Sequence, residues 1–520
     1  MITDTDKNEF TIPTGWIAES LGNLADKITK GATPTTYGYA FQRLGVNFIK
    51  VQNISNGYID LCSITDFISE DAHQNQGKSI LKVNDVLFSI AGTIGETAIV
   101  KSHHLPANTN QALAIISGFS KILIPKYLEF QLRSFVSQKT KDKARGGAMN
   151  NVSLDDLKSL KLLLPPYSEQ QRIVAKIETL FSELDKGIES FKTAREQLKI
   201  YRQSLLKHAF SGKLTEQWRA ENPDKLESAQ ALLQRIETER QQRYQQQLKN
   251  WEANDKQGSK PKALKTLPPL TTEELAELPE GWAWCRLGST NVDVSDGPFG
   301  SNLKSSDYVD NGVRVIRLEN IGALKFIEDK ESYVTDAKYE LLKNHTVSSG
   351  DIVFSSFITE NVRVALVPQS ITKAINKADC FCIRLYGETL SNGYTVMFLS
   401  IRWVFKQLEA QIHGVGRPRI NTTQLKDLPV PVCNSEEQKV IIEKLESCLS
   451  EVDQLDQTIT TALQQAEALR QSILKKAFSG QLVPQDPSDE PASVLLERIR
   501  VEKAALSVKP KSIKPKRCSL

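Results

Sequence analysis

The sequence predicts an α+β fold in which two mixed α/β domains alternate with two long helices, which pair as an antiparallel coiled coil with an internal pseudo-twofold repeat. Three observations predict it. A module of roughly 200 residues occurs twice in the sequence. Each copy starts with short runs of residues that favour β-strands, and each copy ends in a helix with a heptad pattern of apolar residues. At 520 residues the chain is also too long for a single hydrophobic core, so several domains are expected.

The repeat is visible in five pairs of similar segments. In chain order they are PTGWIAESLG at 13–22 with PEGWAWCRLG at 279–288, GVNFIKVQNI at 45–54 with GVRVIRLENI at 312–321, VNDVLFS at 83–89 with SGDIVFS at 349–355, LKSLKLLLPPYSEQ at 157–170 with LKDLPVPVCNSEEQ at 425–438, and SLLKHAFSGKL at 204–214 with SILKKAFSGQL at 472–482. The offset drifts only from 266 (279 minus 13) to 268 (472 minus 204), so the chain contains a duplicated module.

The first part of each module is predicted to be a mixed α/β domain. Runs rich in β-branched and aromatic residues, such as FIKV and DVLFSI in the first copy and RVIRL and DIVFSS in the second, are separated by Gly, Asn and Ser. One helix is expected in each copy, at 126–133 and at 394–405.

The second part of each module is predicted to be a long helix of a coiled coil. Two interleaved apolar series recur every seven residues over five heptads, which is typical of a coiled-coil seam. The predicted seam residues are Ile177, Leu184, Phe191, Leu198, Leu205, Leu445, Val452, Ile459, Ala466 and Ile473. The alternative is a helix packed on its own domain, but a helix over 168–209, roughly 60 Å long, exceeds what one small domain covers.

Local signals mark the ends of these elements. Ser168 and Ser435, each followed by Glu, are suited to begin helices, and Gly212 and Gly480 stand where a left-handed C-cap belongs. We therefore expect a first mixed domain at 1–167, a long helix at 168–212, a short helix with a flexible linker at 213–277, a second mixed domain at 278–434, a second long helix at 435–482, and a short helix with a basic tail at 483–520.

Composition is that of an ordinary globular protein, with 40% hydrophobic and 25% charged residues. No apolar run approaches the roughly 18 residues of a membrane span, and the acidic, polar start is unlike a signal peptide. The seven cysteines, an odd number, indicate reduced thiols and a cytoplasmic location. Net charge is +4, of which residues 501–520 supply +5 (six basic, one acidic), so any nucleic-acid surface must be locally concentrated.

No catalytic centre, metal site or cofactor is expected in the chain itself. The segment 72–79 fits a relaxed phosphate-loop pattern, but it lacks the usual first Gly and has no counterpart in the second module. The Pro-Pro-Tyr sequence after Leu164 resembles a motif of amino-methyltransferases, which need a polar residue at the position of Leu164. Cys380 and Cys382 have no second cysteine pair nearby and are expected in the core.

The duplication itself suggests a function. Two similar domains joined by helices of equal length favour approximate twofold symmetry, in which antiparallel helices hold the domains inverted at opposite ends. Duplex DNA has the same pseudo-symmetry, so such a protein suits two separated half-sites. The two copies agree at scaffold positions and differ in their loops: GATPTTYGYAFQRLG in the first corresponds to DGPFGSNLKSSDYVDNG in the second.

As an ordered set, these motifs resemble the specificity subunit of type I restriction-modification systems. The Pro-x-Gly-Trp-x4-Leu-Gly start, the segment GPFGSNLKSSDYVDNGVRVIRLENIG, the Ser-Glu-Gln helix start and the FSGKL and FSGQL helix ends carry the resemblance. It implies two target-recognition domains that read a bipartite, asymmetric site on double-stranded DNA. It also implies docking of two modification subunits, which bind S-adenosylmethionine and methylate adenine, and of two restriction/translocase subunits. The first domain departs from the family with GATPT in place of GPFGS.

Loop residues able to bond base edges or phosphates are the candidate DNA contacts. In the first domain these are Lys30, Thr33, Thr35, Arg43, Lys50, Gln52, Asn53, Arg145 and Asn150. In the second they are Lys304, Ser305, Arg317, Glu319, Asn320, Arg363, Arg417 and Arg419. Two alternatives stay open: a coiled-coil scaffold without a nucleic-acid role, and a divergent, self-contained DNA methyltransferase.

Overall fold

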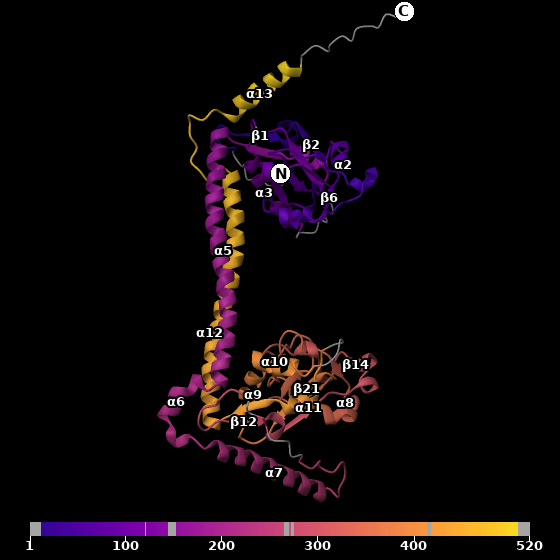
Figure 1. Cartoon of the computed structure of the whole chain (residues 1–520), viewed down its shortest axis with the longest axis vertical. Coiled ribbons are helices and arrows are strands. Elements are labelled where there is room, and N and C mark those ends of the chain that lie inside the picture. Colours follow the sequence, from indigo (N-terminus) through magenta and orange to yellow (C-terminus); the bar gives the residue numbers. More distant parts are fainter. Residues whose placement is uncertain are drawn as a thin grey trace, which may run out of the picture. The chain divides into compact units, whose positions relative to one another are not determined.

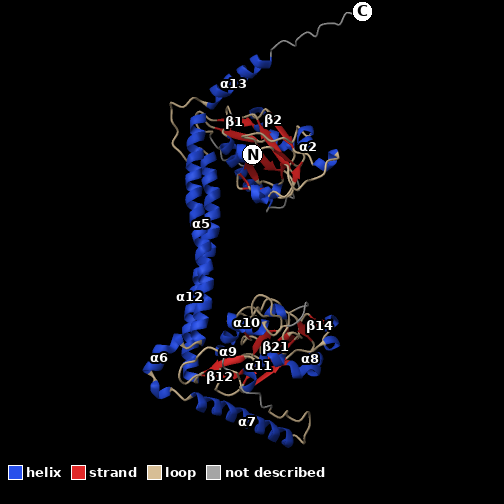
Figure 2. Ribbon diagram, viewed as in Figure 1, coloured by secondary structure: helices blue, strands red, loops and turns tan. Residues whose placement is uncertain are grey.

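The computed structural model describes residues 12–119, 121–143, 152–264, 270–271, 275–412 and 418–507. Its helices and strands form two compact units (Figure 1, Figure 2). Unit 1 consists of Met1–Lys192 and Thr460–Leu520, and unit 2 consists of Thr193–Ile459. The boundaries between the units fall inside both long helices, so each unit combines one globular domain with the start of one long helix and the end of the other.

The globular domain of unit 1 is built around a four-stranded antiparallel sheet in the order β2-β10-β7-β8. A second sheet, β6-β3-β9, contains the parallel pair β3 and β9, while β1-β11 and β4-β5 are two-stranded. The strands are β1 (Ile17–Ser20), β2 (Lys27–Lys30), β3 (Val46–Ile49), β4 (Ile54–Ser55), β5 (Tyr58–Ile59), β6 (Phe67–Ile68), β7 (Val86–Ser89), β8 (Thr97–Ile99), β9 (Ala107–Thr109), β10 (Leu113–Ser117) and β11 (Lys161–Leu164). The helices are α1 (Leu21–Leu24), α2 (Glu70–Asn75), α3 (Pro125–Lys143) and α4 (Leu154–Ser159).

The globular domain of unit 2 repeats the four-stranded sheet, the parallel strand pair and the pairing of its first and last strands. Its four-stranded sheet is β13-β21-β18-β19, its mixed sheet is β14-β16-β15-β20-β17 with β15 parallel to β20, and β12 pairs with β22. The strands are β12 (Ala283–Arg286), β13 (Val292–Ser295), β14 (Tyr308–Val309), β15 (Val313–Ile316), β16 (Tyr333–Val334), β17 (Thr346–Val347), β18 (Ile352–Ser355), β19 (Val364–Leu366), β20 (Ala374–Asn376), β21 (Cys380–Leu385) and β22 (Pro429–Val432). The helices are α8 (Asp336–Leu342), α9 (Asn392–Leu399), α10 (Arg402–Glu409) and α11 (Thr422–Asp427).

The prediction of two mixed α/β domains is therefore confirmed, with one correction in the second. The single helix expected at 394–405 is two helices, α9 and α10, separated by Ser400 and Ile401. Ile401 has extended backbone angles (φ −72°, ψ 151°) and is buried, so the chain leaves the first helix to place this side chain in the core. The periodicity of apolar residues continues across the break, which is why the sequence pattern did not reveal it.

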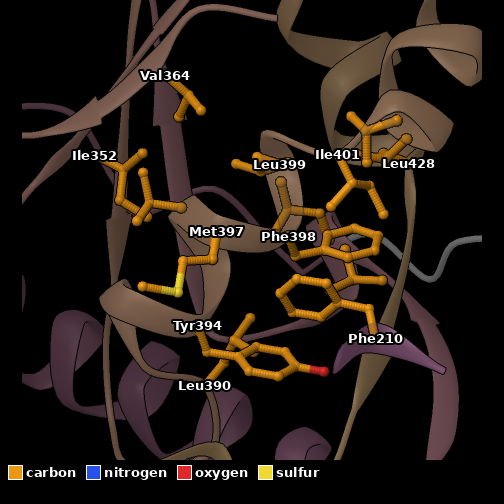
Figure 3. Packing of buried hydrophobic residues seen from close by; sticks show 14 of the residues in the cluster. Phe210, Ile352, Val364, Leu390, Tyr394, Met397, Phe398, Leu399, Ile401 and Leu428 are labelled. Atoms are coloured by element: carbon orange, nitrogen blue, oxygen red, sulfur yellow. The ribbon is translucent and has the colours of Figure 1, made fainter. Parts of the chain in front are cut away.

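The core of unit 2 shows how a domain is attached to a long helix. Phe210, the last residue of α5 (Tyr167–Phe210), lies edge-on against Tyr394 and Phe398, with ring centroids 5.1 and 5.3 Å apart (Figure 3). Residues of the four-stranded sheet, including Ile352 and Val364, belong to the same buried cluster. The end of α5 is thus part of the core of the second domain.

The two long helices, α5 and α12 (Ser435–Phe478), contribute opposite ends to each unit. In unit 1, Ile173 and Ile177 near the start of α5 share a buried cluster with Ile473 near the end of α12. In unit 2, Leu205 near the end of α5 and Leu445 near the start of α12 share another. Ion pairs also join the helices within each unit: Arg470 with Asp185 in unit 1, and Arg195 with Asp456 and Arg202 with Asp453 in unit 2.

Most predicted seam residues are buried, but Phe191 is a correction. Ile177, Leu205, Leu445, Val452, Ile459, Ala466 and Ile473 are buried, and Leu184 and Leu198 are partly buried. The Phe191 side chain is 37% exposed. It lies in the middle of α5 and belongs to neither of the buried clusters that contain the two ends of this helix.

Both long helices end as the sequence predicts. Gly212 and Gly480 have left-handed backbone angles (φ 74° and 72°), and a Cβ atom on either would lie 2.2 Å from Pro279 or 2.5 Å from Pro13. The following segment of each repeat contains a shorter helix. After α5 come α6 (Glu216–Glu221) and α7 (Ala229–Ala253) in unit 2, and after α12 comes α13 (Ala492–Ser507) in unit 1.

Candidate functional site

Matching glycines bring a variable loop to the end of the parallel strands in each domain. A Cβ atom on Gly31 would lie 2.1 Å from the carbonyl oxygen of Thr109, and one on Gly297 would lie 2.1 Å from the carbonyl carbon of Lys377. Only glycine permits this approach of the loop to the segment after β9 or β20. The loops that begin there are the ones in which the two repeats differ.

The parallel strand of each domain is followed by a tight turn with an asparagine at its centre. The Asn53 side chain accepts from the Lys50 backbone N–H (2.8 Å), and Asn320 accepts from the Arg317 backbone N–H (2.9 Å). Each amide group then donates to a carbonyl: that of Ser63 (2.8 Å) or Ile327 (2.9 Å). Both asparagines are buried. Their prediction as DNA contacts is corrected, because their hydrogen-bonding groups hold the turn.

In unit 2, three predicted arginines lie on one connected surface. Arg317 follows β15, and the carbonyl of the next residue, Leu318, accepts from Arg363 Nη1 (3.1 Å). Arg363 Nη2 donates to Ser355 Oγ (3.0 Å), and the neighbouring Ser356 hydroxyl donates to Asp379 (3.2 Å). Asp379 in turn forms an ion pair with Arg419 Nη1 (3.3 Å). Packing thus joins residues about a hundred positions apart in the sequence.

Of these arginines, Arg419 is the most accessible. Its side chain is 46% exposed, and its guanidinium lies 4.8 Å from the centre of the Phe357 ring. Arg363, by contrast, is half-buried and bonds to a backbone carbonyl and a serine, so it supports the surface from beneath. Arg417, predicted beside Arg419, lies outside the described residues.

The loop residues Lys304, Ser305 and Glu319 are exposed, as a binding role requires. The Lys304 backbone N–H donates to Asp307, which keeps the loop folded while the ammonium remains available. Glu319 forms an ion pair with one of the arginines, because its carboxylate lies 3.0 Å from Arg317 Nη1.

In unit 1 the predicted residues lie around the ends of β2, β3 and β9. Thr33 donates to Gln111, and the backbone N–H of Ala32 donates to Thr109, whose hydroxyl donates to the carbonyl of Ile49 beside Lys50 (2.8 Å). The remaining predicted residues Lys30, Thr35, Arg43 and Gln52 are exposed. Arg145 and Asn150 lie outside the described residues.

Sequence reasoning missed three residues of the surface in unit 2. Lys377 lies in the loop after β20, with its ammonium 5.6 Å from the Tyr308 ring, and Asp379 has a left-handed backbone (φ 70°) that directs the loop toward Arg419. The guanidinium carbon of Arg317 also lies over the Tyr308 ring, 5.8 Å from its centre. The repeat offset could have revealed Tyr308, since 308 minus 41 and 317 minus 50 both equal 267, and position 41 is also aromatic.

Each globular domain is fixed to its following long helix by an equivalent set of residues, which we call joint 1 (Trp16, Glu169, Gln170) and joint 2 (Trp282, Glu437, Gln438). The indole N–H of Trp16 donates to Glu169, and that of Trp282 donates to Glu437, at 2.9 Å in both cases. Each glutamine is buried and forms hydrogen bonds with three backbone groups. Gln170, for example, accepts from the Ile124 N–H and donates to the carbonyls of Ile122 and Pro165. The joints set how each loop surface is held on its helix.

The joints differ in charge. Glu437 also accepts from Thr215 and Arg219, both at 2.6 Å. The second oxygen of Glu169 has no hydrogen-bond partner among the described residues, and burial raises the pKa of this carboxyl, while the Trp16 hydrogen bond and Arg172 lower it.

Metal-binding clusters and reactive nucleophiles are the features that would give these surfaces a chemistry of their own. Within the described ranges, no group of three His, Cys, Asp or Glu residues is arranged to hold a metal ion. Cys380 and Cys382 are buried core residues, and burial raises the pKa of the Cys380 thiol to about 12, so it is a poor nucleophile at neutral pH. No helix in the described part of the chain has the length and apolarity of a membrane span.

Comparison with known proteins decides the family. The model of the type I restriction modification DNA specificity domain matches residues 13–190 and 303–465, which together exceed half of the chain. The chain belongs to this family. Its relatives are specificity subunits, so this chain is a non-catalytic component of a restriction-modification complex.

Among the similar specificity subunits is the EcoBI subunit of Escherichia coli, 33% identical over 46% of this chain and 50% of that protein, so the match spans half of that relative's length. The EcoKI subunit of Escherichia coli strain K12 is 24% identical over 97% of this chain and 98% of its own. A solved chain from a study of complex assembly and conformational transition of the type I R-M system has a TM-score of 0.64 at 18% identity, covering 91% of this chain and 99% of the other. The HsdS subunit from Thermoanaerobacter tengcongensis has a TM-score of 0.50 at 18% identity, covering 91% and 99%.

Proposed function

We propose that this specificity subunit reads a bipartite, asymmetric site on double-stranded DNA, with one half-site bound by each globular domain. The observation that carries the proposal is the pair of loop surfaces at the ends of β3/β9 and β15/β20. The two surfaces occupy equivalent places on one repeated fold, yet they present different side chains. One scaffold with two different surfaces suits the recognition of two different short sequences.

The two long helices act in this proposal as an antiparallel coiled coil that sets the distance between half-sites. The heptad pattern supports it, as does the packing inside each unit, where the start of one helix meets the end of the other. The pseudo-twofold repeat then presents the two domains in inverted orientation to a duplex whose strands are related by the same symmetry.

The proposed partners are two modification subunits that methylate adenine and two restriction/translocase subunits. S-adenosylmethionine is proposed to bind the modification subunits and not this chain. The names of the relatives support an assembly of this kind, since each is a subunit of a type I restriction enzyme.

Methylome sequencing of cells carrying the system tests the proposal. We expect methylated adenine in a motif made of two short sequences separated by a fixed number of unspecified base pairs, and loss of the motif when this subunit is deleted. Methylation of a continuous motif would contradict the bipartite model. Methylation that persists without this subunit would favour the scaffold alternative, and S-adenosylmethionine binding by the isolated chain would favour the methyltransferase alternative.

A further inference from the structure

The position directly after the parallel strand carries a cation in both domains. Lys50 follows β3 and Arg317 follows β15, at the repeat offset of 267. The preceding residues have equivalent partners, since Ile49 pairs with Thr109 of β9 and Ile316 pairs with Asn376 of β20. The fold therefore presents these two cations at the same place, beside the variable loop of each domain.

Each of these cations rests on an aromatic ring from the variable loop. Lys50 Nζ lies 4.8 Å from the centre of the Phe41 ring, and Arg317 Cζ lies 5.8 Å from the centre of the Tyr308 ring. Phe41 and Tyr308 are themselves related by the offset of 267. A ring beneath a cation attracts it and restricts its motion. Because this arrangement recurs in two copies that otherwise differ in these loops, it is a feature of the recognition surface and not of one domain.

A carboxylate holds each cation from the side, and the carboxylates come from different places. Lys50 Nζ lies 2.8 Å from Asp66 Oδ2, whereas Arg317 Nη1 lies 3.0 Å from Glu319 Oε1. The side chains of Lys50 and Arg317 remain 28% and 39% exposed. For Arg317 the polar contacts engage Nη1, which also donates to Ser332 Oγ (3.3 Å). A guanidinium has five N–H donors in a rigid plane, so further donors exist for a ligand.

A cation held by a ring and a carboxylate is better suited to bind a base edge than a phosphate. A carboxylate beside each cation offsets its charge and repels a phosphate, but it leaves the directional donors intact. A side chain already fixed by a ring and a carboxylate also loses little conformational entropy on binding. Guanine offers two acceptors, O6 and N7, in the major groove, and Arg or Lys is their usual partner.

We propose that Arg317 and Lys50 are specificity-determining residues at equivalent positions of the two half-sites, each donating to the O6/N7 edge of a guanine. Arg317 makes a two-pronged contact, and Lys50 contacts the same edge with a single ammonium. Tyr308, Phe41 and the two carboxylates are positioning residues. The inference rests on the proposed recognition of DNA by this subunit and adds the base that each domain reads at this position.

The test uses the complex of this subunit with its modification partners and a duplex carrying the methylated motif. Dissociation constants are measured for the motif and for duplexes with each base pair replaced in turn. In Arg317→Lys, which keeps the charge, we expect the preference for one G·C pair in one half-site to fall about 10-fold or more. Preferences in the other half-site and affinity for unrelated DNA stay unchanged. Lys50→Ala is expected to abolish a guanine preference in the other half-site only.

Arg243 on α7 supplies a matched control. It also lies over a tyrosine ring, that of Tyr386 at 3.4 Å, and forms an ion pair with the carboxylate of Asp293, but it lies on the helix between α5 and the second globular domain. Arg243→Lys is expected to leave every base preference unchanged. Unfolding midpoints in urea, measured for all variants, show whether each subunit is folded.

Three other outcomes overturn the inference. If the variant complexes bound all duplexes more weakly by the same factor, and their affinity depended less on salt concentration, Lys50 and Arg317 would be phosphate contacts. Unchanged binding of every duplex by folded Arg317→Lys and Lys50→Ala complexes would assign these cations a structural role. A wild-type complex without any sequence preference would remove the proposed function as well, which separates that failure from the other two.

Discussion

The two joints have the same local hydrogen-bond geometry, but their glutamates have different charged partners. In both, a tryptophan at the domain start bonds a buried glutamate in the first turn of the long helix. Glu437 is neutralised by Arg219, which comes from α6, whereas one oxygen of Glu169 has no hydrogen-bond partner among the described residues. Duplication therefore preserved the hydrogen-bonding motif, while the segment after each long helix, which diverged, decides whether the buried charge is compensated.

The same contrast appears in how the following segment is attached. In unit 1 the C-terminal segment is held by Arg172, which forms an ion pair with Asp489 (2.7 Å), and by Arg500 with Glu19 (2.8 Å). The counterpart of Arg172 in unit 2 is Val440, at an offset of 268. Each unit thus uses an arginine near its joint. In unit 2, Arg219 forms an ion pair with Glu437, whereas in unit 1, Arg172 pairs with Asp489 and lowers the pKa of Glu169 only through its charge.

The largest difference between the joints is expected on removal of the carboxylates. Glu437→Ala leaves the largely buried Arg219 without its counter-ion and should lower the free energy of unfolding by about 3 kcal/mol. Glu169→Ala removes one acceptor from Trp16 and should cost about 1 kcal/mol. Urea unfolding followed by tryptophan fluorescence measures both. Equal losses would contradict the difference in pairing.

The glutamines provide a test in which the joints should behave alike. Gln438 bonds the backbone of Ser391, Thr389 and Cys433, and Gln170 bonds an equivalent set, so each Leu substitution leaves three buried or partly buried backbone groups without this partner. Gln170→Leu and Gln438→Leu are each expected to cost about 2 kcal/mol by the same urea measurement. A clearly larger loss in one would show that the glutamines, and not only the glutamates, have diverged in role.

Replacing each carboxylate by its neutral isostere isolates charge from shape. Glu169→Gln still accepts from Trp16 and removes a buried charge, one oxygen of which has no hydrogen-bond partner among the described residues, so stability at pH 7 should stay equal or rise by up to about 1 kcal/mol. Glu437→Gln removes the counter-ion of Arg219 and should lower stability by about 1–2 kcal/mol. Thermal unfolding of the pair at pH 7 gives the comparison, and a loss in Glu169→Gln would show that its charge is compensated.

The smallest expected effect is a pH dependence at joint 1. Burial raises the pKa of Glu169 above its ordinary value of 4.5, so the folded state holds this proton more tightly than the unfolded state. Its contribution to stability is then fully present below pH 4.5 and is lost as pH rises through the raised pKa. The stability of Glu169→Gln relative to wild type should therefore increase over this window. A flat difference between pH 4 and 8 would contradict the raised pKa.

Much of the fold follows from the sequence because it is encoded by local and repeating patterns. The heptads, the Ser-Glu helix starts and the Phe-Ser-Gly ends gave the two long helices nearly to the residue. The break between α9 and α10 was missed since the apolar pattern does not change there. Phe191 was misplaced because periodicity reports the face of a helix and not what covers it.

The candidate site was predicted less completely. The loops and most exposed residues were found from the divergence of the repeats, but Asn53 and Asn320 proved to hold turns, and Lys377, Tyr308 and Asp379 were overlooked. A polar residue just after a strand looks the same in sequence whether its donors face solvent or a backbone carbonyl.

The sequence by itself determined the duplication, the order of domain and helix, and the places where the two copies must differ. Only the tertiary structure decided which charges are paired: Arg219 with Glu437, Arg419 with Asp379, and Lys50 and Arg317 with their rings and carboxylates. The physical reason is range. Helix and strand signals act over a few neighbouring residues, whereas the partner of a side chain is set by packing that joins segments up to hundreds of residues apart.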